Sequence, residues 1–413
     1  MRAVVLSIGR ELVSGLRLDT HASAVARALG GVGIEVLRHE TLDDDVRAVA
    51  TAIRRAGDEA DVVVVTGGLG PTLDDTTREA LAEAMGVPLE EHPVAEAHLE
   101  AWARARGKTL SESNRRQAML PRGAEALANP IGTAVGIAAR VGRARVFCLP
   151  GVPAEMCRML AEEVVPAIRR LVAGEQETRA KPGSIVRTIR TFGLAESIVG
   201  ERLADLMAPD RRPRVGTAVS AGIVDVHIYG FGAPEVVAAD AAEVRRRLGD
   251  AVFGEGEERL EDAVAALLAK KKRTLAVAES CTGGLVAAKL VNVPGISAYL
   301  EEAVVAYSNA SKVRSAGVLE RLIREQGAIS EAVARAMAEG IRRRTGADIG
   351  LGLTGIAGPS GGTPGKPVGT VWFALADAAG TLAAREVFSG DRGFIRQRAA
   401  NHALNLARLR LLG

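Results

Sequence analysis

The stretch Leu275-Ala-Val-Ala-Glu-Ser-Cys-Thr-Gly-Gly284 places a short apolar run directly before a polar turn that contains two glycines. Residues 275–278 predict a buried strand, and the apolar spacing of residues 285–291 predicts a helix. The turn between them would expose Ser280 and Cys281, which is how a chain presents a nucleophile. We therefore expect a strand, turn and helix unit of an α/β domain at this point.

The turn would lie at the N-terminus of the predicted helix, where free backbone N–H groups and the helix dipole favour negative charge. Such a place can stabilise the oxyanion of acyl transfer, and Thr282 can cap the helix. A nucleophilic serine also needs a base, and His402 is the only histidine after position 227. A lysine is therefore the better candidate for the base.

Lys312 lies 32 residues after Ser280, in the segment Tyr307-Ser-Asn-Ala-Ser-Lys312, which follows the apolar run 303–306. If this second strand lies beside the first, Lys312 can reach Ser280. Partial burial would then lower the pKa of Lys312, so that its neutral amine accepts the serine proton. Spacing alone leaves two alternatives open, a solvated lysine in a first helical turn and a serine that only caps a helix.

Six motifs in the C-terminal part of the chain occur in a fixed order. They are Ala-Glu-Ser-Cys-Thr-Gly-Gly284, Tyr-Ser-Asn-Ala-Ser-Lys312, Gly-Ala-Ile-Ser-Glu331, Thr-Gly-Ile-Ala-Gly-Pro359, Lys-Pro-Val-Gly-Thr370 and Ser-Gly-Asp-Arg392. Together they resemble the C-terminal domain of the CinA (competence/damage-inducible) family, which is similar to nicotinamide mononucleotide deamidase. The resemblance implies an amidase of pyridine nucleotide salvage, which hydrolyses the carboxamide of nicotinamide mononucleotide to nicotinate mononucleotide and ammonia.

The resemblance also implies roles for individual residues. Ser280 would be the nucleophile and Lys312 the base, with Tyr307 and Thr354 as further catalytic residues. Cys281 is the rival nucleophile, because a thiolate is intrinsically stronger, although a small buried residue is its ordinary role. The reaction needs no cofactor. The residues expected to contact substrate are Thr282, Gly283, Gly284, Gly355, Gly358 and Arg392.

The phosphate of such a substrate requires an anion-binding segment. The glycine-rich stretch 355–369 follows the strand-like run 348–354 and offers clustered N–H groups, with Lys366 and Arg392 as charges. It is not a Walker A loop, because the Gly-Lys-Ser/Thr spacing is missing. On composition alone, a plain surface loop is the alternative.

Composition predicts a globular protein of two or three domains, since the chain has 413 residues of which 47% are apolar. The formal net charge is only +3, and aromatic residues make up 3%, so nucleic acid is not an expected partner. Three scattered cysteines suit a reducing compartment. No apolar run is long enough to span a membrane, and we expect a cytoplasmic protein.

Residues 1–172 alternate strand and helix signals, with strands expected at 2–8 and 61–66 and a helix face at 22–29. This alternation predicts a parallel sheet, in which ligands bind beyond the carboxyl ends of the strands. The segment Gly67-Gly-Leu-Gly-Pro-Thr-Leu-Asp-Asp75 falls there. Its N–H groups can meet phosphates, and Asp74 or Asp75 can either bind a divalent cation or cap a helix.

The N-terminal motifs resemble the first domain of the same family, which is related to molybdopterin-binding domains and in some members is a metal-dependent ADP-ribose pyrophosphatase. These motifs are Ile8-Gly-Arg-Glu-Leu12, the 67–75 segment, Asn114-Arg-Arg-Gln-Ala118, Asn129-Pro-Ile-Gly-Thr-Ala134 and Leu149-Pro-Gly-Val-Pro-Ala-Glu-Met156. The resemblance implies Asp74 and Asp75 as ligands of Mg²⁺ or a similar metal. The ligand-binding residues that it implies are Gly67, Gly68, Gly70, Thr72, Asn114, Gly132 and Thr133.

Three positions depart from the pattern of that first domain, namely Arg10, His21 and Val135. Inactive ligand binding is therefore an alternative to ADP-ribose hydrolysis. At the level of the whole chain, two other functions stay open, a molybdopterin-binding protein and a non-enzymatic competence or recombination partner.

The chain between the two outer domains predicts a linker at 174–183 and a small α+β domain at 184–254. This domain resembles the KH-like middle domain of the family. It lacks an evident Gly-x-x-Gly clamp, so RNA binding is not expected. The C-terminal domain would then span 257–413, and the resemblance makes a homodimer plausible.

Overall fold

The computed structural model describes residues 1–107, 109–175, 184–231 and 233–413. Their contacts divide the chain into two compact units, one of Met1–Val186 with Gly230–Pro234 and one of Arg187–Tyr229 with Glu235–Gly413. The predicted linker began too early, because residues 174 and 175 still belong to helix α8 (Val165–Glu175). The rest of that predicted linker, 176–183, lies outside the described residues.

The N-terminal domain is built on a sheet in the order β2-β1-β3-β8-β7-β6. The first four strands in this order are parallel, and β7 and β6 complete the sheet as antiparallel neighbours. The predicted parallel sheet is therefore confirmed for four strands, whereas its antiparallel edge was not predicted. The strands are β1 (Arg2–Ile8), β2 (Glu35–Leu42), β3 (Val62–Thr66), β6 (Glu125–Leu127), β7 (Gly136–Val141) and β8 (Ala144–Leu149).

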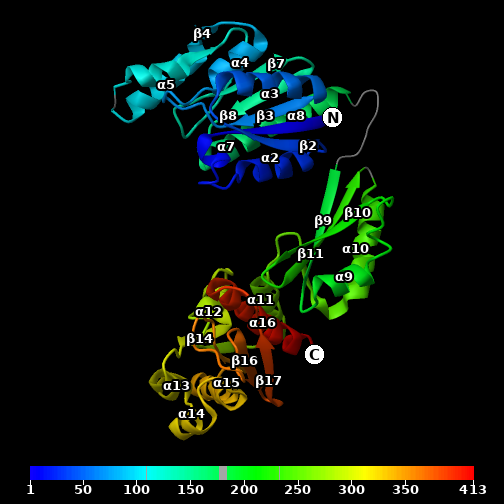
Figure 1. Ribbon diagram of the computed structural model, residues 1–413, viewed down its shortest axis with the longest axis vertical. Coiled ribbons are helices and arrows are strands. Elements are labelled where there is room, and N and C mark those ends of the chain that lie inside the picture. The colour runs from blue at the N-terminus through cyan, green and yellow to red at the C-terminus, as the bar shows by residue number, and fades with distance from the viewer. Residues whose placement is uncertain (108, 176–183, 232) are drawn as a thin grey trace. The chain divides into compact units, whose positions relative to one another are not determined.

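Helices cover both faces of this sheet, which explains why β3 begins with four valines and has every residue buried. In Figure 1, α3 and α4 lie on one face, and α2 and α7 lie on the other. A two-stranded sheet of β4 and β5 stands apart from the main one. The bounds are α1 (Arg10–Val13), α2 (His21–Gly30), α3 (Val46–Glu59), α4 (Thr77–Met85), β4 (Leu89–Glu91), α5 (Pro93–Ala105), α6 (Glu112–Arg115), β5 (Met119–Pro121) and α7 (Pro153–Met159).

The middle domain is the predicted α+β unit, a four-stranded sheet in the order β10-β11-β9-β12 with two helices. Its first helix, α9, ends at Arg202. Its second helix, α10, is longer and runs from Pro234 to Leu248. The elements are β9 (Ser184–Phe192), α9 (Glu196–Arg202), β10 (Arg214–Ser220), β11 (Ile223–Phe231), α10 (Pro234–Leu248) and β12 (Val252–Glu255).

The C-terminal domain holds a five-stranded sheet in the order β14-β13-β15-β16-β17. Strands β14, β13 and β15 are parallel, and β16 and β17 are antiparallel. Its strands are β13 (Leu275–Glu279), β14 (Leu300–Val305), β15 (Ile349–Gly355), β16 (Thr370–Asp377) and β17 (Gly380–Val387).

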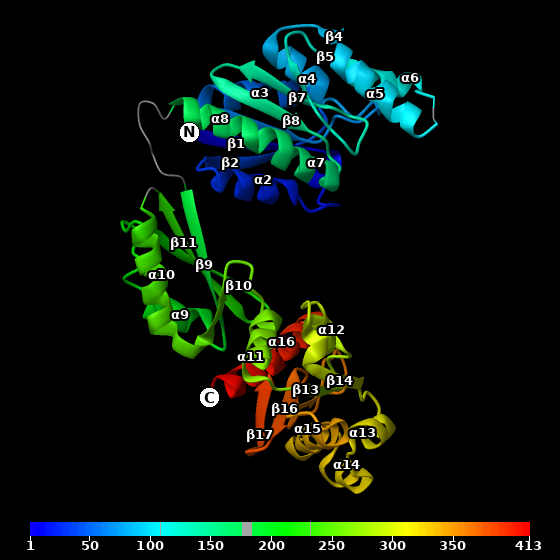
Figure 2. The same cartoon turned by 180° about the vertical axis from the view of Figure 1, so that it is seen from behind.

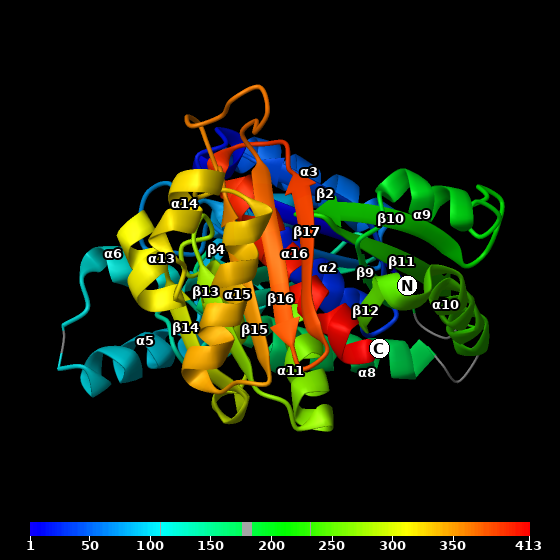
Figure 3. The same cartoon turned by 90° about the horizontal axis from the view of Figure 1, so that it is seen from below.

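Helices again cover both faces of the C-terminal sheet. One core lies between the sheet and α11, α12 and α16, and the other lies under α13, α14 and α15 (Figure 2). Figure 3 shows α15 lying along the sheet. The helices are α11 (Leu260–Lys271), α12 (Leu285–Val291), α13 (Asn309–Ala316), α14 (Glu320–Gln326), α15 (Glu331–Thr345) and α16 (Arg392–Leu412).

Helix α16 also contacts the middle domain, which belongs to the same compact unit. The buried guanidinium of Arg408 donates hydrogen bonds to the backbone oxygens of Asp250 and Val252. In the described ranges, no helix is both long and apolar enough to cross a membrane.

Candidate active site

The Ser280 turn lies beside the segment that carries Lys312, because β13 and β14 are parallel neighbours. The N–H of Ala306, just beyond β14, donates to the backbone oxygen of Glu279 at 2.7 Å. Both strands end at the same edge of the sheet, so the residues that follow them meet there. The condition on which the Ser280 and Lys312 hypothesis depended is therefore met.

Lys312 Nζ lies 3.0 Å from Ser280 Oγ. The same nitrogen donates to the backbone oxygens of Ala306 at 3.1 Å and Tyr307 at 3.2 Å. A neutral amine has two N–H groups and one lone pair, so the two carbonyls occupy both donors and leave the lone pair for the serine hydroxyl. This is the arrangement that a general base requires.

Burial distinguishes this pair from the alternatives that the sequence left open. Lys312 is 2% exposed and Ser280 is 6% exposed, so Lys312 is not a solvated helix residue. Within the described part of the chain, Lys312 forms no ion pair with a carboxylate. Burial lowers the pKa of Lys312 below its ordinary value. The amine is thereby biased towards the neutral form that can accept a proton.

Cys281 is buried, and burial raises the pKa of its thiol to about 12. The nearby negative charge of Glu279 acts in the same direction. The thiol therefore stays protonated near neutral pH, where only a thiolate would compete as nucleophile. His402 is no rival base, since it packs against Phe373 in the core with a ring-centroid distance of 4.5 Å and burial lowers its pKa to about 4.

The start of α12 differs from the prediction that Thr282 caps it. The carboxylate of Glu279 takes that place, accepting from Thr282 Oγ1 at 2.7 Å and from the N–H groups of Gly284 at 3.0 Å, Val286 at 3.1 Å and Ala287 at 2.8 Å. These three N–H groups are therefore not free to stabilise an oxyanion. The prediction that N–H groups at the N-terminus of α12 stabilise the oxyanion is therefore wrong for these three groups.

A cavity of about 280 Å³ opens above Ser280 and Lys312. Asn309 also lines this cavity. It was not predicted as a site residue, although it belongs to the same motif as Tyr307 and Lys312. Of the residues expected to contact substrate, Thr282, Gly283 and Gly284 do not line the cavity. The predicted residues that do line it are Ser280, Tyr307, Lys312, Thr354, Gly355, Gly358 and Arg392.

Arg392, at the start of α16, joins two walls of this cavity. Its guanidinium donates to the Tyr307 hydroxyl at 2.9 Å and to the Gly358 backbone oxygen at 2.7 Å. Thr354 Oγ1 donates to the backbone oxygen of Ala328 at 2.9 Å. Lys366, which the sequence offered as a second charge, instead donates to the Ile329 backbone oxygen at 2.7 Å and does not line the cavity.

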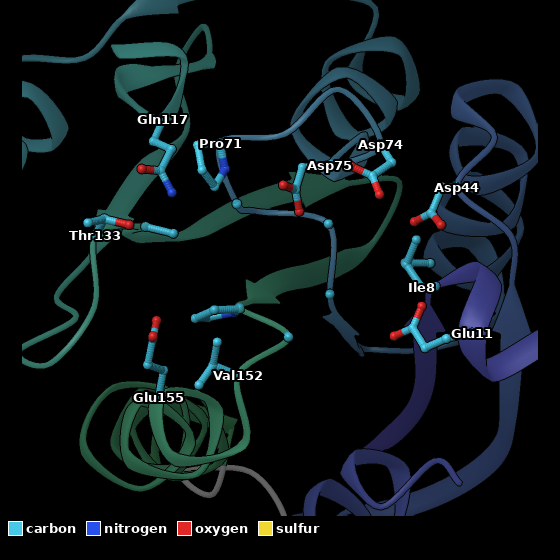
Figure 4. Close-up of a pocket in the computed structure, with 17 residues that line it drawn as sticks. Ile8, Glu11, Asp44, Pro71, Asp74, Asp75, Gln117, Thr133, Val152 and Glu155 are labelled. Atoms are coloured by element: carbon cyan, nitrogen blue, oxygen red, sulfur yellow. The ribbon is translucent and has the colours of Figure 1, made fainter. Parts of the chain in front are cut away.

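A second cavity, of about 320 Å³, lies in the N-terminal domain where the parallel strands end (Figure 4). Three predicted ligand-binding residues, Thr72, Asn114 and Gly132, do not line it. Thr72 instead donates through its N–H and hydroxyl to Asp75 Oδ2, at 2.9 and 2.6 Å. The predicted residues that line the cavity are Gly67, Gly68, Gly70, Asp74, Asp75 and Thr133.

Carboxyl groups dominate this second cavity. Figure 4 shows Glu11, Asp44 and Asp74 on one side and Glu155 on the opposite side. Burial raises the pKa of Asp44, and the charges of Asp43, Glu11 and Asp74 add to that effect. Among the described residues that line the cavity there is no lysine or arginine.

The metal-binding role of Asp74 and Asp75 stays a prediction. Across the described residues, no three His, Cys, Asp or Glu side chains converge as a metal site. Asp75 is held by Thr72, and neither aspartate caps α4, whose N-cap residue is Thr76. By contrast, Asp45 caps α3 by accepting from the Ala48 N–H.

None of the three positions that depart from the family pattern is among the residues that line this cavity. The Arg10 guanidinium pairs with Asp43 at 3.0 Å, and the Arg10 N–H donates to Asp44 at 2.9 Å. His21 begins α2, and Val135 is buried. The three side chains are therefore not part of the cavity lining.

Three family descriptions match successive parts of the chain. Residues 257–411 match the CinA C-terminal domain, residues 186–254 the damage-inducible protein CinA KH domain, and residues 4–170 the probable molybdopterin binding domain. A CinA-like protein of Citrifermentans bemidjiense is 45% identical, with 100% of this chain and 98% of that protein covered. A CinA-like protein of an Anaeromyxobacter species is 43% identical, with 98% of each covered.

Solved structures are also similar to part of the chain. One is the crystal structure of the protein CinA with unknown function from Thermoplasma acidophilum, whose sequence is 34% identical in the matched part. The match covers 40% of this chain and 97% of that one, with a TM-score of 0.38.

Proposed function

This chain belongs to the CinA family, and from that membership we propose that its C-terminal domain hydrolyses the carboxamide of nicotinamide mononucleotide. The products would be nicotinate mononucleotide and ammonia. The observation that carries the proposal is the 3.0 Å contact between Lys312 Nζ and Ser280 Oγ at the floor of a cavity. A buried serine and lysine pair of this kind suits acyl transfer from an amide.

In the proposed reaction, Ser280 Oγ attacks the amide carbon while its proton passes to Lys312 Nζ. The tetrahedral intermediate then collapses, the C–N bond breaks, and Lys312 returns the proton to the departing ammonia. Water attacks the resulting ester, again giving a proton to Lys312. Release of the carboxylate product returns that proton to Ser280 and restores the starting state.

The cavity offers groups for the remainder of a mononucleotide. Arg392 lies at the exposed end and carries the charge that a phosphate monoester requires. Its bonds to Tyr307 and Gly358 hold the guanidinium in place, so it is positioned before substrate arrives. Asn309 adds a polar residue to the lining of the same cavity.

A direct assay tests the proposal. Purified protein is incubated with nicotinamide mononucleotide, and ammonia and nicotinate mononucleotide are measured together. We expect the two products to form in equal amounts without added metal. Absence of turnover, or release of free nicotinamide in place of ammonia, would contradict the deamidase proposal.

Replacing Cys281 with alanine should leave at least about half of the deamidase activity, because a protonated buried thiol does not act as nucleophile. Loss of the small buried side chain should cost about 1 kcal/mol of unfolding free energy. Steady-state rates and thermal unfolding of the variant check both statements. If the activity falls as far as in a Ser280 variant, the thiol is the nucleophile.

A second function is favoured by the acidic cavity of the N-terminal domain. We propose that it binds a nucleotide diphosphate of the ADP-ribose type, with glycine amides of the 67–70 segment near the phosphates. The described residues do not form a ready metal site, so no catalytic step is assigned to a metal. The five carboxyl groups would nevertheless repel a diphosphate that arrives without cations.

This charge distribution predicts that ADP-ribose binding depends on a divalent cation. Calorimetry with the full chain should detect binding in Mg²⁺ and none in a chelator, and Asp44→Asn should weaken the dependence. Equal binding with and without Mg²⁺ would contradict the argument. Production of AMP and ribose phosphate in the same mixtures would separate hydrolysis from binding alone.

A further inference from the structure

Glu279 precedes Ser280 and is 1% exposed. Its two oxygens accept four hydrogen bonds, from Thr282, Gly284, Val286 and Ala287. In the described part of the chain it forms no ion pair. Burying a carboxylate without a cation is unfavourable unless many donors surround it, and a serine or threonine could cap the helix without that cost.

The four bonds connect the end of β13 to the first turn of α12 and thereby fix the path of the chain between them. Ser280 is the first residue of that path. Lys312 is held separately, by the backbone oxygens of Ala306 and Tyr307. The 3.0 Å separation of the serine and lysine therefore depends on how firmly the turn is held.

A second side chain holds the same turn from helix α16. Arg396 donates through Nε and Nη2 to the Thr282 backbone oxygen, at 3.1 and 2.8 Å. Thr282 is thus held twice, by its hydroxyl on Glu279 and by its carbonyl on Arg396. Gly283 follows with a φ of 64°, a left-handed conformation in which a larger side chain would be strained. The turn has little freedom to move.

We propose that Glu279 and Arg396 are positioning residues that hold Ser280 at hydrogen-bond distance from Lys312. Neither side chain lines the cavity, so neither contacts the substrate. The inference rests on the proposed function only for the identity of the amide. It concerns the reactivity of Ser280 itself, which is measured without that substrate.

The test is Glu279→Gln, which keeps the size of the side chain but replaces one acceptor oxygen by a donor. The rate at which a fluorophosphonate modifies Ser280 is followed by mass spectrometry, and kcat and KM for nicotinamide mononucleotide are measured in parallel. A displaced nucleophile should slow labelling and kcat by about 10- to 100-fold, with KM changed less than about 3-fold. A role in substrate binding would raise KM instead.

Glu261→Gln is the matched control. Glu261 is also buried in this domain, but its carboxylate lies near Arg259 and Lys289 and touches neither the turn nor the cavity. This variant should label at the wild-type rate. Arg396→Met provides a second test, because Arg396 is partly exposed and its loss leaves no buried charge, and several-fold slower labelling is expected.

The outcomes separate the two proposals. If both Glu279→Gln and Arg396→Met label at the wild-type rate, the positioning role is overturned. If the wild type labels at Ser280 and the variants are slow, yet nicotinamide mononucleotide is not hydrolysed, the positioning role stands and the deamidase proposal fails. A wild-type Ser280 that resists the probe overturns the positioning role, whereas the deamidase proposal falls only if nicotinamide mononucleotide is not hydrolysed. If Glu279→Gln does not fold, Arg396→Met alone decides.

Discussion

Ser280→Ala should reduce deamidase activity by roughly four to six orders of magnitude, because the hydroxyl that attacks the amide is removed. The fold should be retained, because the hydrogen bond that Ser280 Oγ makes in the described structure is to Lys312 Nζ and links no other element to the turn. Single-turnover measurement of ammonia release is needed to detect the residual rate. Binding of nicotinamide mononucleotide should persist, because Arg392, Thr354 and Tyr307 remain in the cavity.

Ser330→Ala is the matched control for the alternative that Ser280 only caps a helix. Ser330 caps α15 by accepting from the Val333 N–H. Its replacement should lower stability by about 1 kcal/mol and leave the deamidase rate unchanged. If Ser280→Ala behaves like Ser330→Ala, with lower stability and an unchanged rate, Ser280 is not the nucleophile.

Local patterns predicted the elements around this site well. The strand at 275–278 and the helix at 285–291 are present because apolar spacing follows directly from burial of one or both faces. The contact between Ser280 and Lys312 was predicted only on the condition that their two strands are neighbours. It depends on which strands are neighbours, and strand order is set by packing across the whole sheet.

Two groups of residues were not predicted as parts of a site, for a related reason. Glu279 belongs to the Ser280 motif, and a glutamate at the end of a buried strand indicates that hydrogen-bond donors surround it. Those donors lie three to eight residues later in the chain, so the motif alone does not identify them. In the N-terminal cavity, Glu11, Asp44 and Glu155 come from three distant segments. Only the folded sheet brings their strand ends and loops together.

Replacing Lys312 tests the base independently of the nucleophile. Lys312→Ala should lower kcat by about 10²- to 10⁴-fold, the usual contribution of a positioned general base. Lys289→Ala is a matched control, because this lysine is largely buried in the same domain but pairs with Glu261, away from the cavity. It should retain activity. Equal losses in the two variants would indicate general destabilisation.

The pH dependence of the wild-type activity shows which protonation state of Lys312 is active. Only the neutral amine accepts a proton, so activity should be present above the Lys312 pKa and lost as the pH falls through it. Because burial lowers that pKa from its ordinary value of 10.5, the rising limb of kcat/KM should lie below pH 10.5. Lys312→Ala should lack this limb, and small alkylamines should restore part of its activity by entering the vacated space. A pH profile that keeps the same limb in Lys312→Ala would assign the titrating group, and with it the base, to another residue.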